Sequence, residues 1–354
     1  MSSALIAGSR ERDQLLHEWV AEQAGPFALD PNSLAPASAD ASFRRYFRVA
    51  SSAHGSLIVM DAPPAQEDVG PFLHARDVFA QTGVHVPAVH FADRERGFLL
   101  LEDFGGTHYL AAIRSSASQL DAPARADALY RPALSALVRL QAHGRTDAFA
   151  PYDAALLRRE LELFREWYCG RHLGVTLSDA QHQALDRVFA LLIANNIAQP
   201  QVVVHRDYHS RNLMVLDDAR RSPGILDFQD AVTGPVTYDL VSLLRDAYVR
   251  WDEEQVLDWA VRYWEQARRD GVPIQADFGE FYRDFEWMGL QRHLKVLGIF
   301  ARLKHRDGKD GYVNDMPLVM AYTRACAERY SAFGPLVQLL DELEGRETPA
   351  GYTF

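Results

Sequence analysis

Three oxygen-bearing side chains stand at spacings that could support phosphoryl transfer. Asp207 follows the apolar run 202–204, which predicts a short buried strand, and Asn212 comes five positions later. Asp227 lies 15 positions beyond Asn212, within the motif Ile-Leu-Asp-Phe. The turn-forming segment 217–224 between them predicts a hairpin, which would bring Asn212 and Asp227 side by side.

Such a set would divide phosphoryl transfer among three groups. The reaction needs an oriented hydroxyl, in-line geometry and cations on the phosphate oxygens. The amide oxygen of Asn212 and the carboxylate of Asp227 are hard ligands of the kind that Mg²⁺ prefers, with waters and substrate phosphates in its other positions. Asp207 would accept or orient the proton of the acceptor hydroxyl. Each residue alone is more often a turn or cap residue, so the prediction rests on the joint pattern.

The segment 205–229 resembles the catalytic loop and metal-binding segment of the aminoglycoside phosphotransferase family, which shares the protein-kinase fold. Protein kinases carry His-Arg-Asp and Asp-Phe-Gly at these places, and this chain has His-Arg-Asp at 205–207 and Asp-Phe-Gln at 227–229. The resemblance implies ATP and Mg²⁺ as cofactors and the roles given above for the three side chains. It also implies that Asp239 braces the catalytic loop from the next helix; Asp239 would also suit the N-cap of that helix.

The run 226–248 is similar to that of bacterial kinases that phosphorylate the anomeric hydroxyl of N-acetylmuramate and N-acetylglucosamine during cell-wall recycling. This resemblance implies an amino-sugar acceptor and a sugar 1-phosphate product. Two alternatives stay open. One is a kinase of the same type for an aminoglycoside, a choline-like amine or a homoserine-like alcohol, and the other is a non-catalytic nucleotide-binding module.

Candidate acceptor-site residues are His209, Arg245 and Arg292, because a guanidinium could hold the lactyl carboxylate of N-acetylmuramate. Arg292 lies in a predicted helix at 278–303 with other basic residues, namely His293, Lys295 and Arg302. For this basic face we expect exposure to solvent.

The order of predicted elements fits an α+β, two-lobed protein-kinase-like fold. We expect a small β-rich nucleotide-binding lobe with an N-terminal helix at 1–103 and a larger, mostly helical lobe at 104–354. Aromatic and β-branched residues predict two strands at 43–49 and 57–60 joined as a hairpin, and the Pro- and Ala-rich segment 26–39 is expected to be a break. Helical spacing of apolar residues predicts helices at 10–24, 67–82, 129–142, 152–168 and 178–195.

The segment expected to cover the nucleotide phosphates departs from the family pattern. It has no glycine at 38–42, so Ser42 and nearby backbone amides would be the donors. The next strand lacks the lysine that normally contacts the phosphates. Arg44 or Arg45 could replace it, and we favour Arg44, since only one of two successive strand residues faces inward. Glu67 is the candidate acid to pair with that cation.

The strand at 97–101 runs into a hinge that ends in two glycines. By its place in the order of elements, this hinge is where backbone groups of Glu102, Asp103 and Phe104 are expected to bind adenine.

Composition narrows the classes of partner. The formal charge is −11, from 37 basic and 48 acidic residues, and the basic residues are scattered, which disfavours a nucleic-acid partner. Cys169 and Cys326 are too few for a disulfide framework or a metal cluster. No apolar run approaches the roughly 20 residues of a membrane span. We therefore expect a cytoplasmic enzyme that acts on small molecules and has no obligate protein partner.

Overall fold

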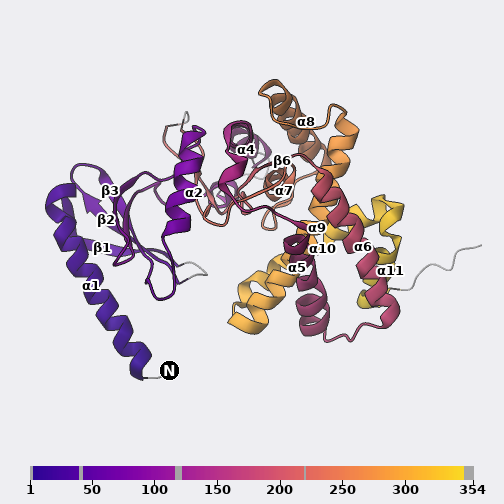
Figure 1. Cartoon of the computed structure of the whole chain (residues 1–354), viewed down its shortest axis with the longest axis horizontal. Helices are drawn as coiled ribbons and strands as arrows, with labels where there is room; N and C mark the ends of the chain where they lie inside the picture. The colour runs from indigo at the N-terminus through magenta and orange to yellow at the C-terminus, as the bar shows by residue number, and fades with distance from the viewer. Residues whose placement is uncertain (1–2, 40–42, 116–121, 219–220, 347–354) are drawn as a thin grey trace, which may run out of the picture.

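A five-stranded antiparallel sheet and a larger group of helices form two parts of the molecule, which lie side by side in Figure 1. The structure is a computed structural model that describes residues 3–39, 43–115, 122–218 and 221–346. This arrangement is the expected two-part α+β architecture.

The sheet has the strand order β1-β2-β3-β5-β4 and carries a helix on each face. In β5, Phe98 and Leu100 pack in the cluster that contains Trp19 of α1, whereas Leu99 and Leu101 pack in the cluster that contains Phe72 of α2. Successive strand residues point to opposite faces, so a continuous apolar strand suits a sheet covered on both sides. The elements are α1 (Ser3–Phe27), β1 (Leu29–Ala39), β2 (Arg45–Ser51), β3 (Gly55–Asp61), α2 (Gly70–Gln81), β4 (Val89–Asp93) and β5 (Phe98–Glu102).

The predicted hairpin of β2 and β3 is confirmed, but the break expected at 26–39 is wrong. Most of that segment forms β1, which lies at the edge of the sheet and pairs with β2. Proline is tolerated in an edge strand because no ladder hydrogen bond is lost there, and the pairing of β1 is irregular on both sides of Ala35 and Pro36. The first hairpin is therefore β1–β2, and the tip of its turn, with Ser42, lies outside the described residues.

The larger part is mostly helical, and the predicted helices at 129–142, 152–168 and 178–195 are confirmed. Its elements are α3 (Tyr109–Arg114), α4 (Ala122–His143), η1 (Thr146–Ala148), α5 (Ala154–Leu163), the π-helix η2 (Phe164–His172), α6 (Asp179–Ala198), β6 (Gln201–Val204), β7 (Leu213–Met214), β8 (Gly224–Ile225), β9 (Val232–Pro235), α7 (Tyr238–Leu244), α8 (Glu253–Arg269), α9 (Phe278–Asp307), η3 (Asp310–Asp315), α10 (Met316–Arg329), η4 (Ser331–Phe333) and α11 (Gly334–Glu344). Within the described ranges, no helix is both long enough and apolar enough to cross a membrane.

Helix α9 runs through the middle of the helical part, where it contacts α5, η2, α6, α7 and α10 (Figure 1). Three of the four basic residues for which we expected exposure are buried, so the expected solvent-exposed face is wrong, and the fourth, Arg302, is partly buried. Arg292 is 4% exposed, His293 2% and Lys295 7%. The sequence pattern misled because the middle of α9 packs against several helices, so its polar residues there face protein and not solvent.

Asp61 joins α1 to the sheet, and its removal should destabilise the smaller part. Its fully buried carboxylate accepts hydrogen bonds from Arg12 of α1 at 2.8 Å and from Arg45 of β2 at 2.9 Å. We expect Asp61→Asn to lower the free energy of unfolding by about 3–5 kcal/mol, because two guanidinium groups lose their buried partner. Urea unfolding measures this loss.

Asp13 provides the matched control. It also pairs with Arg45, but its side chain is 49% exposed. Asp13→Asn should therefore cost about 1 kcal/mol or less. A loss for Asp61→Asn no larger than that of the control would contradict the role given to Asp61.

Candidate active site

The loop that follows β6 and the segment that follows β8 each hold one motif residue in an unusual backbone conformation. Arg206 has φ of +77° and Asp227 has φ of +64°, both in the left-handed region. This region costs a residue with a side chain about 1–3 kcal/mol, so the surrounding structure must hold it in place. Such strain is concentrated at functional sites, and here it falls on the His-Arg-Asp and Asp-Phe-Gln motifs.

Asp239 of α7 holds the loop that follows β6 by hydrogen bonds to its backbone. Its fully buried carboxylate accepts hydrogen bonds from the backbone N–H of His205 at 2.7 Å and of Arg206 at 3.0 Å. This is the brace that the family resemblance implied. The N-cap position of α7 belongs to Thr237, so the carboxylate of Asp239 serves the loop and not the helix end.

Asp246, which lies just after the end of α7, supports the same loop, and sequence reasoning missed it. Its carboxylate accepts from the backbone N–H of Ser210 at 3.0 Å and from the hydroxyl of the same residue. The sequence contained no signal for this beyond the resemblance of the run 226–248.

The structure brings the three predicted catalytic-site residues together. The short strands β7 and β8 pair antiparallel, as predicted, and the Nδ2 of Asn212 lies 3.0 Å from the backbone oxygen of Asp207 and 3.2 Å from Oδ2 of Asp227. Gln229, at the position of the kinase glycine, donates to Oδ1 of Asp227 at 2.8 Å. Its role was not predicted.

This geometry suits a cation at Asn212 and Asp227. Because Nδ2 of Asn212 is directed at protein acceptors, its oxygen is the atom that can bind a metal ion beside the Asp227 carboxylate. Within the described part of the chain, no group of three or more His, Cys, Asp or Glu side chains could hold a metal by itself. Two ligands fit Mg²⁺ that takes its other ligands from substrate phosphates and water.

The environment of Asp207 keeps its carboxylate ionised. Burial raises the pKa of Asp207, but the positive charge of Lys295, followed by the influence of His209 and Arg292, lowers it to a value below that of an ordinary aspartate. An ionised carboxylate is the form that can accept a proton from a hydroxyl.

Lys295 and Arg206 belong to a buried ionic cluster around Glu160 of α5. Lys295 Nζ lies 3.0 Å from Glu160 and 2.9 Å from the hydroxyl of Tyr238. Arg206 lies 2.6 Å from Oε1 of Glu160, the same oxygen that Lys295 contacts. One acidic residue therefore balances two cations, one from the catalytic loop and one from α9.

His205 links the two motifs as a neutral ring. Burial lowers the pKa of His205 to about 4. Its Nε2 lies 2.9 Å from the backbone oxygen of Leu226, and its Nδ1 accepts from the backbone N–H of Asp207 at 3.2 Å. The ring thus fixes the distance between the catalytic loop and the start of the Asp-Phe-Gln segment.

The two arginines of the nucleotide lobe have different partners. Arg45 pairs with Asp61 and Asp13, whereas Arg44 Nε lies 3.9 Å from Oε2 of Glu67, just before α2. The structure therefore brings together Arg44 and Glu67, the pair that the sequence suggested as a substitute for the missing lysine.

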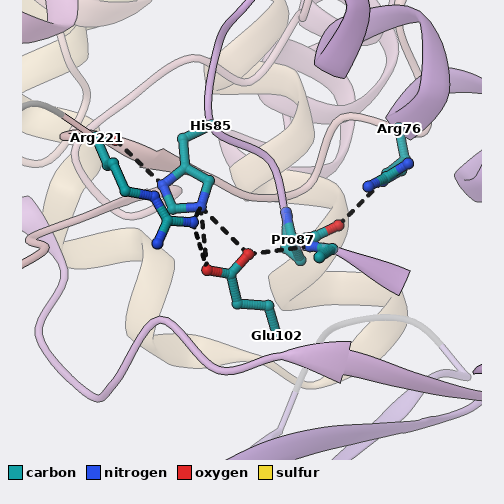
Figure 2. Close-up of polar contacts among 6 residues, drawn as sticks. Arg76, His85, Pro87, Glu102 and Arg221 are labelled. Carbon is teal, nitrogen blue, oxygen red and sulfur yellow. Dashed lines mark hydrogen bonds and ion pairs between the residues drawn. The ribbon is translucent and has the colours of Figure 1, made fainter. Parts of the chain in front are cut away.

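The side chain of Glu102 connects the two parts of the molecule. Figure 2 shows this side chain directed at His85 and at Arg221, a residue of the loop between β7 and β8. Its Oε1 lies 3.1 Å from Nε2 of His85 and 2.7 Å from Nη2 of Arg221. Burial raises the pKa of Glu102, but hydrogen bonds from His85 and the backbone of Ala88, together with Arg221, lower it to about 2. The ionised side chain is thus a structural link, and the backbone N–H of Glu102 donates to the backbone oxygen of Ala88 at 2.8 Å, which leaves the backbone oxygen of Glu102 for the predicted adenine contact.

The other two hinge residues also use their side chains for packing. Asp103 accepts from Arg48 and from Ser56, each at 2.6 Å. Phe104 is buried against Gly224, where a Cβ would meet its ring at 2.5 Å, so only glycine allows this close approach. The hinge is therefore fixed in position by its side chains.

The three predicted acceptor-site residues divide into two groups. Arg292 and His209 act electrostatically on Asp207, and each has a buried nitrogen without a hydrogen-bond partner. Arg245 instead lies 2.7 Å from Glu253 and faces the ring of Tyr322. His209 is thus part of the catalytic loop and Arg292 acts on that loop from α9, whereas Arg245 is paired with Glu253.

Comparison with known proteins agrees with this geometry. The model of the "Phosphotransferase enzyme family" matches residues 33–272. The chain belongs to this family. Two relatives named N-acetylmuramate/N-acetylglucosamine kinase, from Pseudomonas putida and Neisseria meningitidis, are each 46% identical to it. The alignments cover 94% of this chain and 97% of the first relative, and 90% and 93% for the second.

Solved structures support the fold of this phosphotransferase. The ethanolamine kinase of Plasmodium vivax is 10% identical and superposes with a TM-score of 0.58 over 83% of each chain. The gentamicin complex of APH(2")-IIa is 14% identical, with a TM-score of 0.55 over 89% of this chain and 97% of that chain. The expected protein-kinase-like fold and the family resemblance are confirmed, and the chain is a kinase.

The brace under the catalytic loop of this phosphotransferase should give a distinct pH dependence. Burial raises the pKa of Asp239 to about 7. An unfolded aspartate titrates near 3.9, so the folded state holds an extra proton between these values. The free energy of unfolding therefore falls as pH rises through this window, by up to about 1.4 kcal/mol per pH unit.

Asp239→Asn removes this titration. The free energy of unfolding of the wild type minus that of the variant should decrease from about pH 5 to about pH 7 and then level off. Urea unfolding of both proteins across this range measures the difference. A difference that stays constant or rises with pH would contradict the assigned pKa.

Proposed function

We propose that this kinase transfers the γ-phosphoryl group of ATP to the anomeric hydroxyl of an N-acetylated amino sugar, N-acetylmuramate or N-acetylglucosamine. The product would be the sugar 1-phosphate. The observation that carries the proposal is the convergence of Asp207, Asn212 and Asp227 on one braced loop. The acceptor is supported by the names of the relatives, which are 46% identical over at least 90% of this chain. Because ATP is the donor, we place the reaction in the cytoplasm.

Asp207 is the proposed base. The anomeric hydroxyl is more acidic than an ordinary alcohol, so Asp207 needs only to orient it and to take its proton late in the reaction. The positive charges of Lys295 and Arg292 support this role, because they keep the carboxylate ionised.

Asn212 and Asp227 are the proposed ligands of Mg²⁺. When bound, the ion would neutralise charge on the phosphate oxygens. Gln229 and the amide nitrogen of Asn212 each hold one oxygen of the Asp227 carboxylate, and so fix its orientation. Preorganised ligands of this kind lose little freedom when the ion and the nucleotide arrive.

The smaller lobe, at 1–103, is the proposed nucleotide lobe, and 104–354 is the proposed catalytic and acceptor lobe. Arg44, with Glu67 as its partner, would contact the phosphates in place of the missing lysine, and Ser42 would donate from the β1–β2 turn. The backbone of 102–104 would bind adenine. Its rigid side-chain anchoring supports this assignment.

The product identifies the reaction directly. Purified protein is incubated with ATP, Mg²⁺ and N-acetylmuramate or N-acetylglucosamine, and the product is examined by phosphorus NMR. We expect a sugar 1-phosphate, whose phosphorus couples to the anomeric proton. Phosphate at another hydroxyl, or turnover only with aminoglycosides, choline-like amines or homoserine-like alcohols, would refute the proposed acceptor. ATP binding without turnover on any acceptor would favour a non-catalytic module.

Asp207→Asn should separate catalysis from nucleotide binding. The variant loses the proton acceptor but keeps the fold of the loop, since the contacts of Asp207 with Asn212 and His205 use backbone atoms. We expect kcat to fall by about 10²–10⁴-fold, with the dissociation constant of ATP almost unchanged. Steady-state kinetics and calorimetry measure the two quantities. A variant with near-normal kcat would show that Asp207 is not the base.

A further inference from the structure

One turn of α9 opposite the catalytic loop contains a concentration of buried polar atoms without hydrogen-bond partners. In the described structure these atoms are Oε1 of Gln291, Nε and Nη1 of Arg292, and Nδ1 of His293. Nδ1 of His209, on the loop itself, is a further one. Buried polar groups are usually satisfied, so each of these exceptions requires its own explanation, because consecutive residues of a helix point about 100° apart and do not share one site.

Arg292 is the exception with the greatest energetic consequence, because it carries a full charge. It is 4% exposed, and the described part of the chain gives it no ion pair. Lys295, three residues later on the same helix, is fully engaged by Glu160 and Tyr238. The burial of α9 therefore does not by itself leave cations unpaired. A buried charge without a partner is costly, and a ligand anion would remove that cost.

Two anions reach this site during the proposed reaction, the transferred phosphate and any acid group of the acceptor. The groups that Arg292 influences include the proposed base, Asp207, and His209 of the same loop. Asn212, Asp227 and Gln229 form the proposed phosphate side of the loop. The position of Arg292 thus favours the acceptor.

We propose that Arg292 binds a carboxylate carried by the acceptor, the lactyl group of N-acetylmuramate, and so makes the site select an acidic amino sugar over a neutral one. This inference rests on the proposed function and deepens it. The guanidinium would form charge-assisted hydrogen bonds through Nε and Nη1, the two nitrogens that lack protein partners. Arg245 does not take this role, because Glu253 already neutralises it.

The test compares three acceptors on two enzymes. N-acetylmuramate, its lactyl methyl ester and N-acetylglucosamine share the anomeric hydroxyl, but only the first carries the charge. For the wild type, kcat/KM should be about 10- to 100-fold higher for N-acetylmuramate than for its ester. In Arg292→Met, kcat/KM for the acid should fall to the level of the ester, because the charged group of the substrate has lost its partner.

The alternatives give different results. An unchanged ratio of acid to ester in Arg292→Met would overturn the inference. An equal loss on all three acceptors would assign Arg292 to the ionisation of Asp207 or to the phosphate, and would overturn the inference as well. If the wild type phosphorylates all three equally well, the inference fails while the proposed function stands. If it phosphorylates none, the proposed function itself fails.

Two controls distinguish recognition from a structural role. Arg302, on the same helix, also has a buried Nε without a partner, so Arg302→Met is a matched substitution and should leave the ratio of acid to ester unchanged. The urea midpoint of Arg292→Met without ligand should equal or exceed that of the wild type, since the removed charge has no partner in the protein. A lower midpoint would indicate a structural role and would count against the inference.

Discussion

The active site depends on one buried carboxylate, that of Asp239, which holds two consecutive backbone N–H groups of the catalytic loop. Arg206 is left-handed, so the chain turns sharply between the strand and the base. A turn of this kind inside the protein needs partners for its backbone donors, because buried N–H groups without partners are rare. The carboxylate supplies both partners at once, and the direction of Asp207 follows from it.

Around this brace the two charged loop residues Arg206 and Asp207 each have an oppositely charged counterpart on a helix. Glu160 of α5 balances Arg206 of the loop and Lys295 of α9. The same lysine is the main positive influence on Asp207. Such effects are strongest where water is excluded, since charges interact more strongly in a medium of low dielectric constant. The central position of α9 therefore serves the electrostatics of the site as well as its packing.

The sequence predicted local features well. The strand at β6, the β7–β8 hairpin and helix α6 follow from short-range patterns, and the spacing of Asp207, Asn212 and Asp227 was enough to place them together. Contacts between distant segments could not be predicted in this way. Glu160 pairs with Lys295 across 135 positions (295 − 160), and the burial of α9 depends on helices that pack from several directions. Strand β1 was missed because its prolines are tolerated only at a sheet edge, and sequence patterns do not show which strand is at the edge.

The proposed nucleotide lobe keeps its position relative to the catalytic loop through two connections. Helix α2 provides an apolar connection, because the buried ring of Phe228 lies 5.0 Å from Phe72 and 5.7 Å from Phe79, measured between ring centroids. Phe228 directly follows Asp227, so a shift of α2 would move the proposed metal ligand. Glu67, the partner of Arg44, lies just before the same helix. Arg44, the proposed phosphate cation, and Asp227, the proposed metal ligand, are thus both tied to α2. Glu102 and Arg221 form a second connection, between the hinge and the loop that joins β7 to β8. Two independent connections of this kind restrict rotation as well as translation of one lobe relative to the other, which in-line phosphoryl transfer requires.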